Sequence, residues 1–307
     1  MSSLYQDPNW PRANRWLSGE HAPNPIGRLA ILGAPAKLGS ISPGRCDLAP
    51  RAVRSALGRF STYDFDGSRD VQELAAQDLG DLDEITNLTV EQMFPRVRDA
   101  VSLALEDANA VVLLGGDNSI TRPGCHALAP LNRSALLTVD AHLDLRDLSN
   151  GLTNGNPVRA LLADGLPGRH ILQIGIQSFA NSKTYADVAR EAGITVIPVE
   201  RVFERGIDSV VSDALARLSS VADAIYLDLD LDVLDRSYAP ATPGSRPGGL
   251  APWQIRRAAR LCGAHPKLRV MDLVEIDPEK DIADSTSLAA AACLLSFAAG
   301  VHERLKP

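Results

Sequence analysis

The sequence contains only four cysteines among its 307 residues. The cysteines stand singly and form no CxxC pair, which excludes a disulfide framework and indicates a reducing compartment. The chain also lacks long apolar runs. A membrane-spanning helix needs about 20 consecutive apolar residues, and no stretch of the sequence approaches that length. We therefore expect no membrane span.

Positive charge is not in excess either. The formal net charge is −7, which argues against nucleic-acid binding, because phosphate contacts require clustered Lys and Arg. Residues 1–16, MSSLYQDPNWPRANRW, have neither the basic start nor the apolar core of a secretory signal. We therefore expect a cytoplasmic protein. Its acids gather tightly in two places, so bound cations could neutralise part of the negative charge.

Short, continuously apolar segments alternate with helical patterns from residue 28 onward, and no Gly-, Ser- or Pro-rich linker separates them. This alternation predicts an α/β fold with a parallel sheet covered on both faces. We expect an irregular N-terminal arm over residues 1–27 and a single domain over 28–307. The expected strands are 28–33, 110–116, 135–140, 170–176, 194–199, a strand starting at 224, and 268–276; the expected helices are 51–57, 91–109, 158–164, 183–193, 207–219, 252–262 and 285–299.

Acidic side chains follow four of these strands. They occur at 115–118, at 140–144, at 228–232 and at 275–277. Ligands of parallel α/β sheets bind outside the carboxyl ends of the strands. The sequence therefore predicts a polar site at this edge of the sheet.

The stretch VDAHLDLRD, residues 139–147, places Asp140, His142 and Asp144 at alternating positions directly after an apolar run. Carboxylates with one imidazole and no thiolate suit hard or borderline divalent ions such as Mn²⁺. Together with the acids of 228–235, they could hold two ions about 3.5–4 Å apart. Two alternatives remain open: a polar loop that caps the next helix at 140–144, and a solvated edge strand at 228–235.

Five motifs occur in an order that resembles the arginase/agmatinase (ureohydrolase) family, over about residues 28–300. The resemblance implies a three-layer α/β/α sandwich with a mostly parallel sheet, and a homo-oligomer, trimer or hexamer. The motifs are GGDxS at 115–119, DAHxD at 140–144, DxDxxD at 230–235, APATPG with PGGL at 239–250, and DLVEIDP at 272–278.

The same resemblance implies a centre of two Mn²⁺ ions. Asp140 and Asp230 would bridge the ions. Asp144 would hold one of them, and His142 and Asp232 would hold the other.

Three acids would also be catalytic by this resemblance. Glu275 would accept hydrogen bonds from the planar amidinium or guanidinium end of the substrate. A water acidified by the ions would attack the central carbon, and Asp140 or Asp230 would relay its proton.

Two positions depart from the family pattern. Asn118 stands where the family usually has a His that binds the same ion as Asp144. As a ligand it offers only a neutral amide oxygen, so this ion should be held weakly or be absent. Asn154 stands in the substrate site where arginases and agmatinases place a proton-shuttling His, and where formimidoylglutamases typically have Ser. The sequence from Asp144 to Arg146 also resembles the formimidoylglutamase branch. The alternative explanation of both substitutions is that the protein is a member of the family that is inactive or acts on a different substrate.

Arg146 and Arg159 flank the active-site loop. A glutamate-like substrate carries two carboxylates, which Arg can bind in a bidentate manner. Unpaired surface arginines are the alternative explanation.

Our first hypothesis is a metal-dependent hydrolase of C–N bonds in linear amidines, most like formimidoylglutamase, which converts N-formimidoyl-glutamate to glutamate and formamide. The second is an agmatinase-like or guanidino-acid ureohydrolase that releases urea. The third, of another class, is a non-catalytic paralogue that binds a small ligand. The presence of Glu275 with the carboxylate and His set favours catalysis, because buried acids have no other physical purpose.

Overall fold

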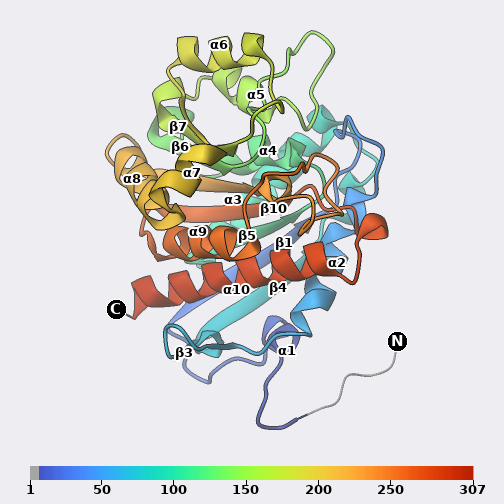
Figure 1. Cartoon of the computed structure of the whole chain (residues 1–307). Helices are drawn as coiled ribbons and strands as arrows, with labels where there is room; N and C mark the ends of the chain where they lie inside the picture. The colour runs from blue at the N-terminus through green and yellow to red at the C-terminus, as the bar shows by residue number, and fades with distance from the viewer. Residues whose placement is uncertain (1–6, 307) are drawn as a thin grey trace.

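The computed structural model describes residues 7–306 and is built around an eight-stranded sheet in which every pairing is parallel (Figure 1). The strand order is β4-β1-β5-β10-β9-β6-β7-β8. A short antiparallel pair, β2 with β3, lies outside this sheet. The strands are β1 (Gly27–Ala34), β2 (Tyr63–Asp64), β3 (Arg69–Asp70), β4 (Leu74–Asp81), β5 (Ala110–Gly115), β6 (Ser134–Val139), β7 (Ile171–Ile176), β8 (Thr195–Pro198), β9 (Ala224–Asp230) and β10 (Leu268–Val274).

Helices cover both faces of the sheet. One apolar cluster joins the sheet to α1, α2 and α7 to α10, and a second cluster joins it to α3, α4, α5 and α6. This arrangement confirms the three-layer α/β/α sandwich. The helices are α1 (Ala13–Leu17), α2 (Ala49–Leu57), α3 (Val90–Asp107), α4 (Thr121–His126), α5 (Pro157–Asp164), α6 (Lys183–Ala192), α7 (Val199–Arg205), α8 (Ile207–Ser219), α9 (Pro252–Ala264) and α10 (Ser285–Leu305).

Burial on both faces explains why the central strands are apolar throughout. In β5, Val112 and Leu114 belong to one cluster, whereas Val111 and Leu113 belong to the other. Successive side chains of a strand point to opposite faces, so a strand covered on both sides needs apolar residues at every position.

Helix α10 is longer than expected from the sequence. It spans 21 residues and, by length and composition alone, could cross a membrane, which the sequence analysis did not anticipate. However, 72% of its most apolar window is buried inside the protein. It lies against α9 and α2 (Figure 1), so its apolar surface belongs to the core.

Six of the strands and α-helices that the structure describes were not predicted from the sequence: β2, β3, β4, α1, α4 and α7. Strand β4 begins with buried Leu74 but is exposed over its last five residues, so it lacks the continuous apolar run of an inner strand. Helix α1 lies in the arm that we expected to be irregular. Its Trp16 is fully buried, and the indole Nε1 donates a hydrogen bond to the carbonyl of Leu74 at 2.8 Å. The arm is thereby attached to the edge of the sheet.

We expect Trp16→Ala to lower the free energy of unfolding by about 3–5 kcal/mol, because it removes a fully buried ring and leaves a cavity. Trp10→Ala is the matched control, since Trp10 is 43% exposed, and it should cost less than about 1 kcal/mol. Urea denaturation of both variants measures the difference. If Trp16→Ala lowers the free energy of unfolding as little as Trp10→Ala does, the arm does not unfold together with the rest of the protein.

Candidate metal centre

The carboxyl ends of four adjacent strands carry the predicted site residues. Asp140 follows β6, Asp230 ends β9 and Glu275 follows β10, and these three strands lie next to one another in the order β10-β9-β6. Asn118 belongs to the turn after β5, which is the other neighbour of β10. The parallel topology therefore brings segments far apart in the sequence to one edge of the sheet.

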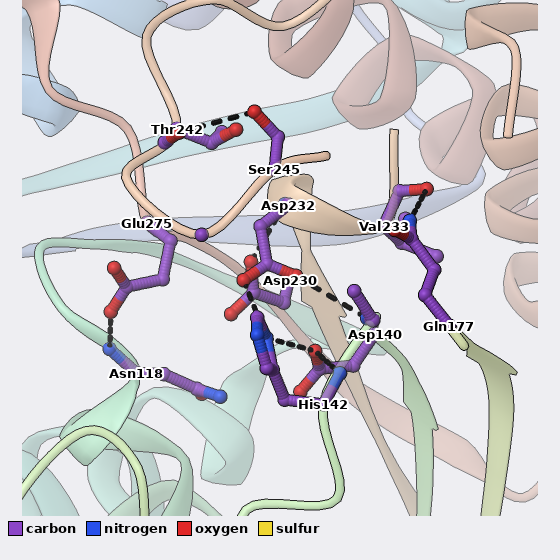
Figure 2. A network of polar contacts seen from close by, with 12 residues as sticks. Asn118, Asp140, His142, Gln177, Asp230, Asp232, Val233, Thr242, Ser245 and Glu275 are labelled. Carbon is purple, nitrogen blue, oxygen red and sulfur yellow. Dashed lines mark hydrogen bonds and ion pairs between the residues drawn. The ribbon is translucent and has the colours of Figure 1, made fainter. Parts of the chain in front are cut away.

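Side chains of the two acidic segments point toward one another at this edge (Figure 2). Asp140, His142 and Asp232 each offer a ligand atom, and these atoms all lie within 4.8 Å of one another. His142 Nδ1 is 2.8 Å from Asp232 Oδ2 and 3.6 Å from Asp140 Oδ1. Asp230 Oδ1 accepts a hydrogen bond from the main-chain N–H of Asp232 at 2.8 Å.

A second group of acids adjoins the first and shares Asp140 with it. Ligand oxygens of Asp140, Asp144 and Asp228 also lie within 4.8 Å of one another. Asp144 has a φ of 52°, a left-handed conformation that costs a non-glycine residue about 1–3 kcal/mol. Asp228 belongs to the acidic segment 228–235, but the family resemblance gave it no role as a ligand.

Burial makes these carboxylates costly to ionise. It raises the pKa of Asp140 to about 7, with a further contribution from the charge of Asp232. Burial and neighbouring acids also raise the pKa values of Asp144, Asp228 and Asp230 well above the usual carboxyl range. Such a set of like charges is stable in its ionised form only beside a positive charge.

Buried oxygen atoms without a hydrogen-bond partner indicate whether a cation fits this site. Within residues 7–306, Asp140 Oδ2 and both carboxylate oxygens of Asp228 are buried without a hydrogen-bond partner. Buried polar atoms normally have a partner, and a divalent cation would supply it. The donors are carboxylate oxygens and one imidazole, which is the set expected for Mn²⁺ and similar ions.

Arg246 is a cation of this site that the sequence analysis missed. Its Nη1 lies 2.8 Å from His142 Nε2 and donates to the Gly244 carbonyl at 2.7 Å. Burial lowers the pKa of His142, but the charges of Asp232 and Asp140 outweigh this and raise it to about 11. The contact with Arg246 requires a lone pair on Nε2, so the imidazole is neutral in this arrangement, because two cations would repel each other here. A metal ion at Nδ1 would require the other neutral tautomer, in which Nε2 carries the proton and no longer accepts from Arg246.

Glu275 is held in place by two hydrogen bonds to the same oxygen. Its Oε1 accepts from the Asn118 main-chain N–H at 2.8 Å and from Asn154 Nδ2 at 2.9 Å. Its φ of 64° is left-handed, and its own N–H donates to the Gly116 carbonyl at 3.0 Å. Burial raises the pKa of Glu275 to about 8. Asn154, whose Oδ1 accepts from the Ile41 N–H at 3.0 Å, thus orients Glu275.

Asn118 offers a hydrogen-bond donor to the acids. Its Nδ2 donates to Asp144 Oδ2 at 2.6 Å, and its Oδ1 lies 2.6 Å from the hydroxyl of Thr121. The sequence analysis expected a neutral amide oxygen as a weak ligand beside Asp144. In this orientation the amide oxygen is directed to Thr121 and not to the acids.

A cavity of about 350 Å³ lies beside this centre. Of the two arginines predicted to bind substrate, Arg146 lines the cavity and Arg159 does not, although the Arg159 main-chain N–H donates to the Asp144 carbonyl at 3.1 Å. The lining also includes His142, Asp144, Asn154, Asp230, Asp232, Arg246 and Glu275.

The fold and this cluster define a class: α/β/α sandwich proteins with a carboxylate-rich cation site at the carboxyl edge of a parallel sheet. The sequence model described as the arginase family matches residues 27–300. The chain belongs to the arginase family, and it is a hydrolase of C–N bonds in linear amidines.

Similar proteins include two formimidoylglutamases. The enzyme of Halalkalibacterium halodurans is 35% identical over 90% of this chain and 88% of its own length. The crystal structure of the Bacillus subtilis enzyme matches with a TM-score of 0.89 and 30% identity, covering 98% of this chain and 95% of that one. The human mitochondrial guanidino acid hydrolase is 29% identical over 87% of this chain and 76% of its own length.

In the absence of divalent cations, we expect the free energy of unfolding to fall as the pH rises from about 5 to 8. The folded pKa values of Asp140, about 7, and Glu275, about 8, lie above the unfolded value, which is near 4. The folded protein therefore binds more protons in this window, and stability declines until both groups ionise.

Urea denaturation in EDTA at several pH values measures this decline. Saturating Mn²⁺ should remove the part of the decline that is due to Asp140, because bound ions hold their carboxylate ligands ionised and release their protons. Glu275→Gln should reduce the decline in EDTA by removing one of the two groups. A stability that rises with pH in EDTA would contradict the expectation.

Proposed function

We propose that this protein is a formimidoylglutamase, which hydrolyses N-formimidoyl-glutamate to glutamate and formamide. The observation that carries the proposal is a single cavity with an acid, Glu275, beside the cation site and two arginines, Arg146 and Arg246, in its lining. These residues match a substrate with a cationic amidine head and an acidic tail. The similarity to formimidoylglutamases supports the same choice.

We propose further that the centre holds two Mn²⁺ ions. Asp140, Asp144, Asp230, Asp232 and His142 would hold these ions. When bound, such ions lower the pKa of water toward 7 and thereby provide hydroxide at neutral pH. The Trypanosoma cruzi formiminoglutamase has been solved with Mn²⁺, which makes Mn²⁺ the first ion to test.

Glu275 would orient the amidine. Both hydrogen bonds that described residues donate to the Glu275 carboxylate are accepted by Oε1. Oε2 is therefore available to an amidinium N–H. The positive charge of the amidinium would favour the ionised carboxylate at neutral pH. The substrate carbon would then lie between Glu275 and the acids of the metal centre.

Asp140 and Asp230 would handle the proton of the reaction. Asp140 Oδ2 is buried without a partner in the described part of the chain. Without bound ions, burial and then the neighbouring acids raise the pKa of both carboxyls. Either group would accept the proton that water loses and return it to the leaving nitrogen. The oxygen of water then forms the formamide carbonyl, the C–N bond to glutamate breaks, and both hydrogens of water end on the glutamate amine, which leaves as an ammonium group.

The tail of the substrate distinguishes this activity from its alternatives. Arginines in the cavity lining would repel the cationic tail of agmatine, which argues against an agmatinase. A guanidino acid has the same head charge and tail charge as formimidoyl-glutamate, so a guanidino-acid ureohydrolase is the second candidate. The product separates the two, since guanidino acids yield urea and formimidoyl-glutamate yields formamide.

We also propose a cytoplasmic location and assembly into a trimer or hexamer. All four cysteines are free and buried, as suits a reducing compartment. Light scattering of the purified chain measures the assembly.

Glu275→Gln should lower kcat/KM for formimidoyl-glutamate by about 10²- to 10³-fold, because the isosteric amide cannot pair with the amidinium charge. The Mn²⁺ content should stay at the wild-type value, since Glu275 is not a proposed ligand. Steady-state kinetics with metal analysis by mass spectrometry check both statements. If the metal content falls in parallel with the activity, Glu275 acts on the centre and not on the substrate.

Arg146→Ala should raise KM for formimidoyl-glutamate by about tenfold or more with a smaller change in kcat, because it removes a charge-assisted contact to the tail. Arg159→Ala is the matched control and should leave KM nearly unchanged, since Arg159 does not line the cavity. Equal effects would favour the pair of arginines predicted from the sequence. Faster cleavage of agmatine than of any acidic substrate would refute the formimidoylglutamase assignment.

A further inference from the structure

We propose that Asp228 is a direct ligand of the cation beside Asp140 and Asp144. The inference rests on the metal centre proposed above and adds to it a residue that neither the sequence motifs nor that proposal included. It also explains how an ion can be held at this position although Asn118 directs its amide nitrogen, and not its oxygen, to the acids.

The position of Asp228 in β9 directs it to the centre. It precedes Asp230 by two residues, and side chains two apart in a strand lie on the same face of the sheet. Its ligand oxygen lies within 4.8 Å of those of Asp140 and Asp144. A cation between these three groups could contact all of them, because metal–oxygen distances near 2.0–2.6 Å are usual for such ions.

The carboxylate of Asp228 accepts no hydrogen bond from a described residue, although it lies close enough to Asp272 for the two carboxyls to share a proton. The residue is fully buried, and neither oxygen receives a hydrogen bond from any residue that the structure describes. Asp140 Oδ2 is likewise buried and accepts no hydrogen bond from a described residue. Two such buried groups therefore face the same space.

Asp272, the neighbour of Asp228 on β10, already accepts hydrogen bonds from other residues. The Asp272 oxygens already accept from the Tyr226 hydroxyl at 2.7 Å and from the Leu229 N–H at 3.2 Å, and the Thr121 hydroxyl lies 2.8 Å away. Asp272 is thus a satisfied carboxylate with Asp228 beside it in register. Two adjacent carboxylates repel each other unless Asp228 faces a cation or carries a proton that it donates to Asp272.

Asp228→Asn separates these two possibilities. The amide has nearly the same shape as a protonated carboxyl and can donate to Asp272 from Nδ2, so it preserves a purely structural role. It cannot supply an anionic oxygen to a cation. We expect Asp228→Asn to weaken the binding of one Mn²⁺ per subunit by at least tenfold and to leave the other ion unaffected.

Isothermal titration of metal-free protein with MnCl₂ measures both ions, and electron paramagnetic resonance reports their spin coupling. Asp187→Asn is the control for the loss of one negative charge, because Asp187 lies on α6 in surface ion pairs with Lys183 and Arg190. This control should bind both ions like the wild type. Adding Asn118→His to Asp228→Asn should restore the weakened ion by supplying an imidazole to the same site.

Wild-type affinity for both ions in Asp228→Asn would overturn the proposal and identify Asp228 as a neutral hydrogen-bond donor to Asp272. If the wild-type protein binds no divalent cation, the whole metal centre fails, and with it this inference. Crystals of the wild-type protein with Mn²⁺ provide a test that does not depend on the folding of a variant. An Asp228 oxygen within about 2.5 Å of an anomalous manganese peak supports the proposal, and a separation above about 3.5 Å from every peak contradicts it.

Discussion

Repulsion among buried carboxylates is the constraint on which the rest of this structure depends. Five aspartates meet at the carboxyl edge of the sheet, and burial together with mutual repulsion raises the pKa of most of them. The only imidazole among them, His142, contacts two of these acids. Such a cluster is tolerable in a folded protein only when positive charge is bound to it. The five are Asp140, Asp144, Asp228, Asp230 and Asp232.

The sheet supplies the rigidity that holds these charges together. Strands β6, β9 and β10 are buried on both faces, and their apolar side chains pack into the two clusters that fix the helices. The acids begin where the strands end, so the repulsion acts on groups that the core prevents from moving apart. Left-handed backbone at Asp144 and Glu275 is maintained in the same way, by surroundings that determine the conformation.

Much of this arrangement could be predicted from the sequence, and the exceptions have physical reasons. The inner strands are continuous apolar runs, and the order of acids after them indicates a common edge. Strand β4 is half exposed and carries no such run. Asp228 lies inside a strand, where its contact with Asp140 depends on strand order and not on local spacing. Arg246 reaches His142 through a loop whose path no periodicity encodes.

The two positions that depart from the family pattern share one property. Asn118 and Asn154 each direct an amide nitrogen at an acid, Asp144 in one case and Glu275 in the other. An amide does not titrate, so it orients its acid equally well at every pH, whereas an imidazole would lose or change its hydrogen bond near neutrality. Asn154 therefore cannot shuttle a proton. On the mechanism proposed above, proton transfer in this site falls instead to the carboxylates of the centre.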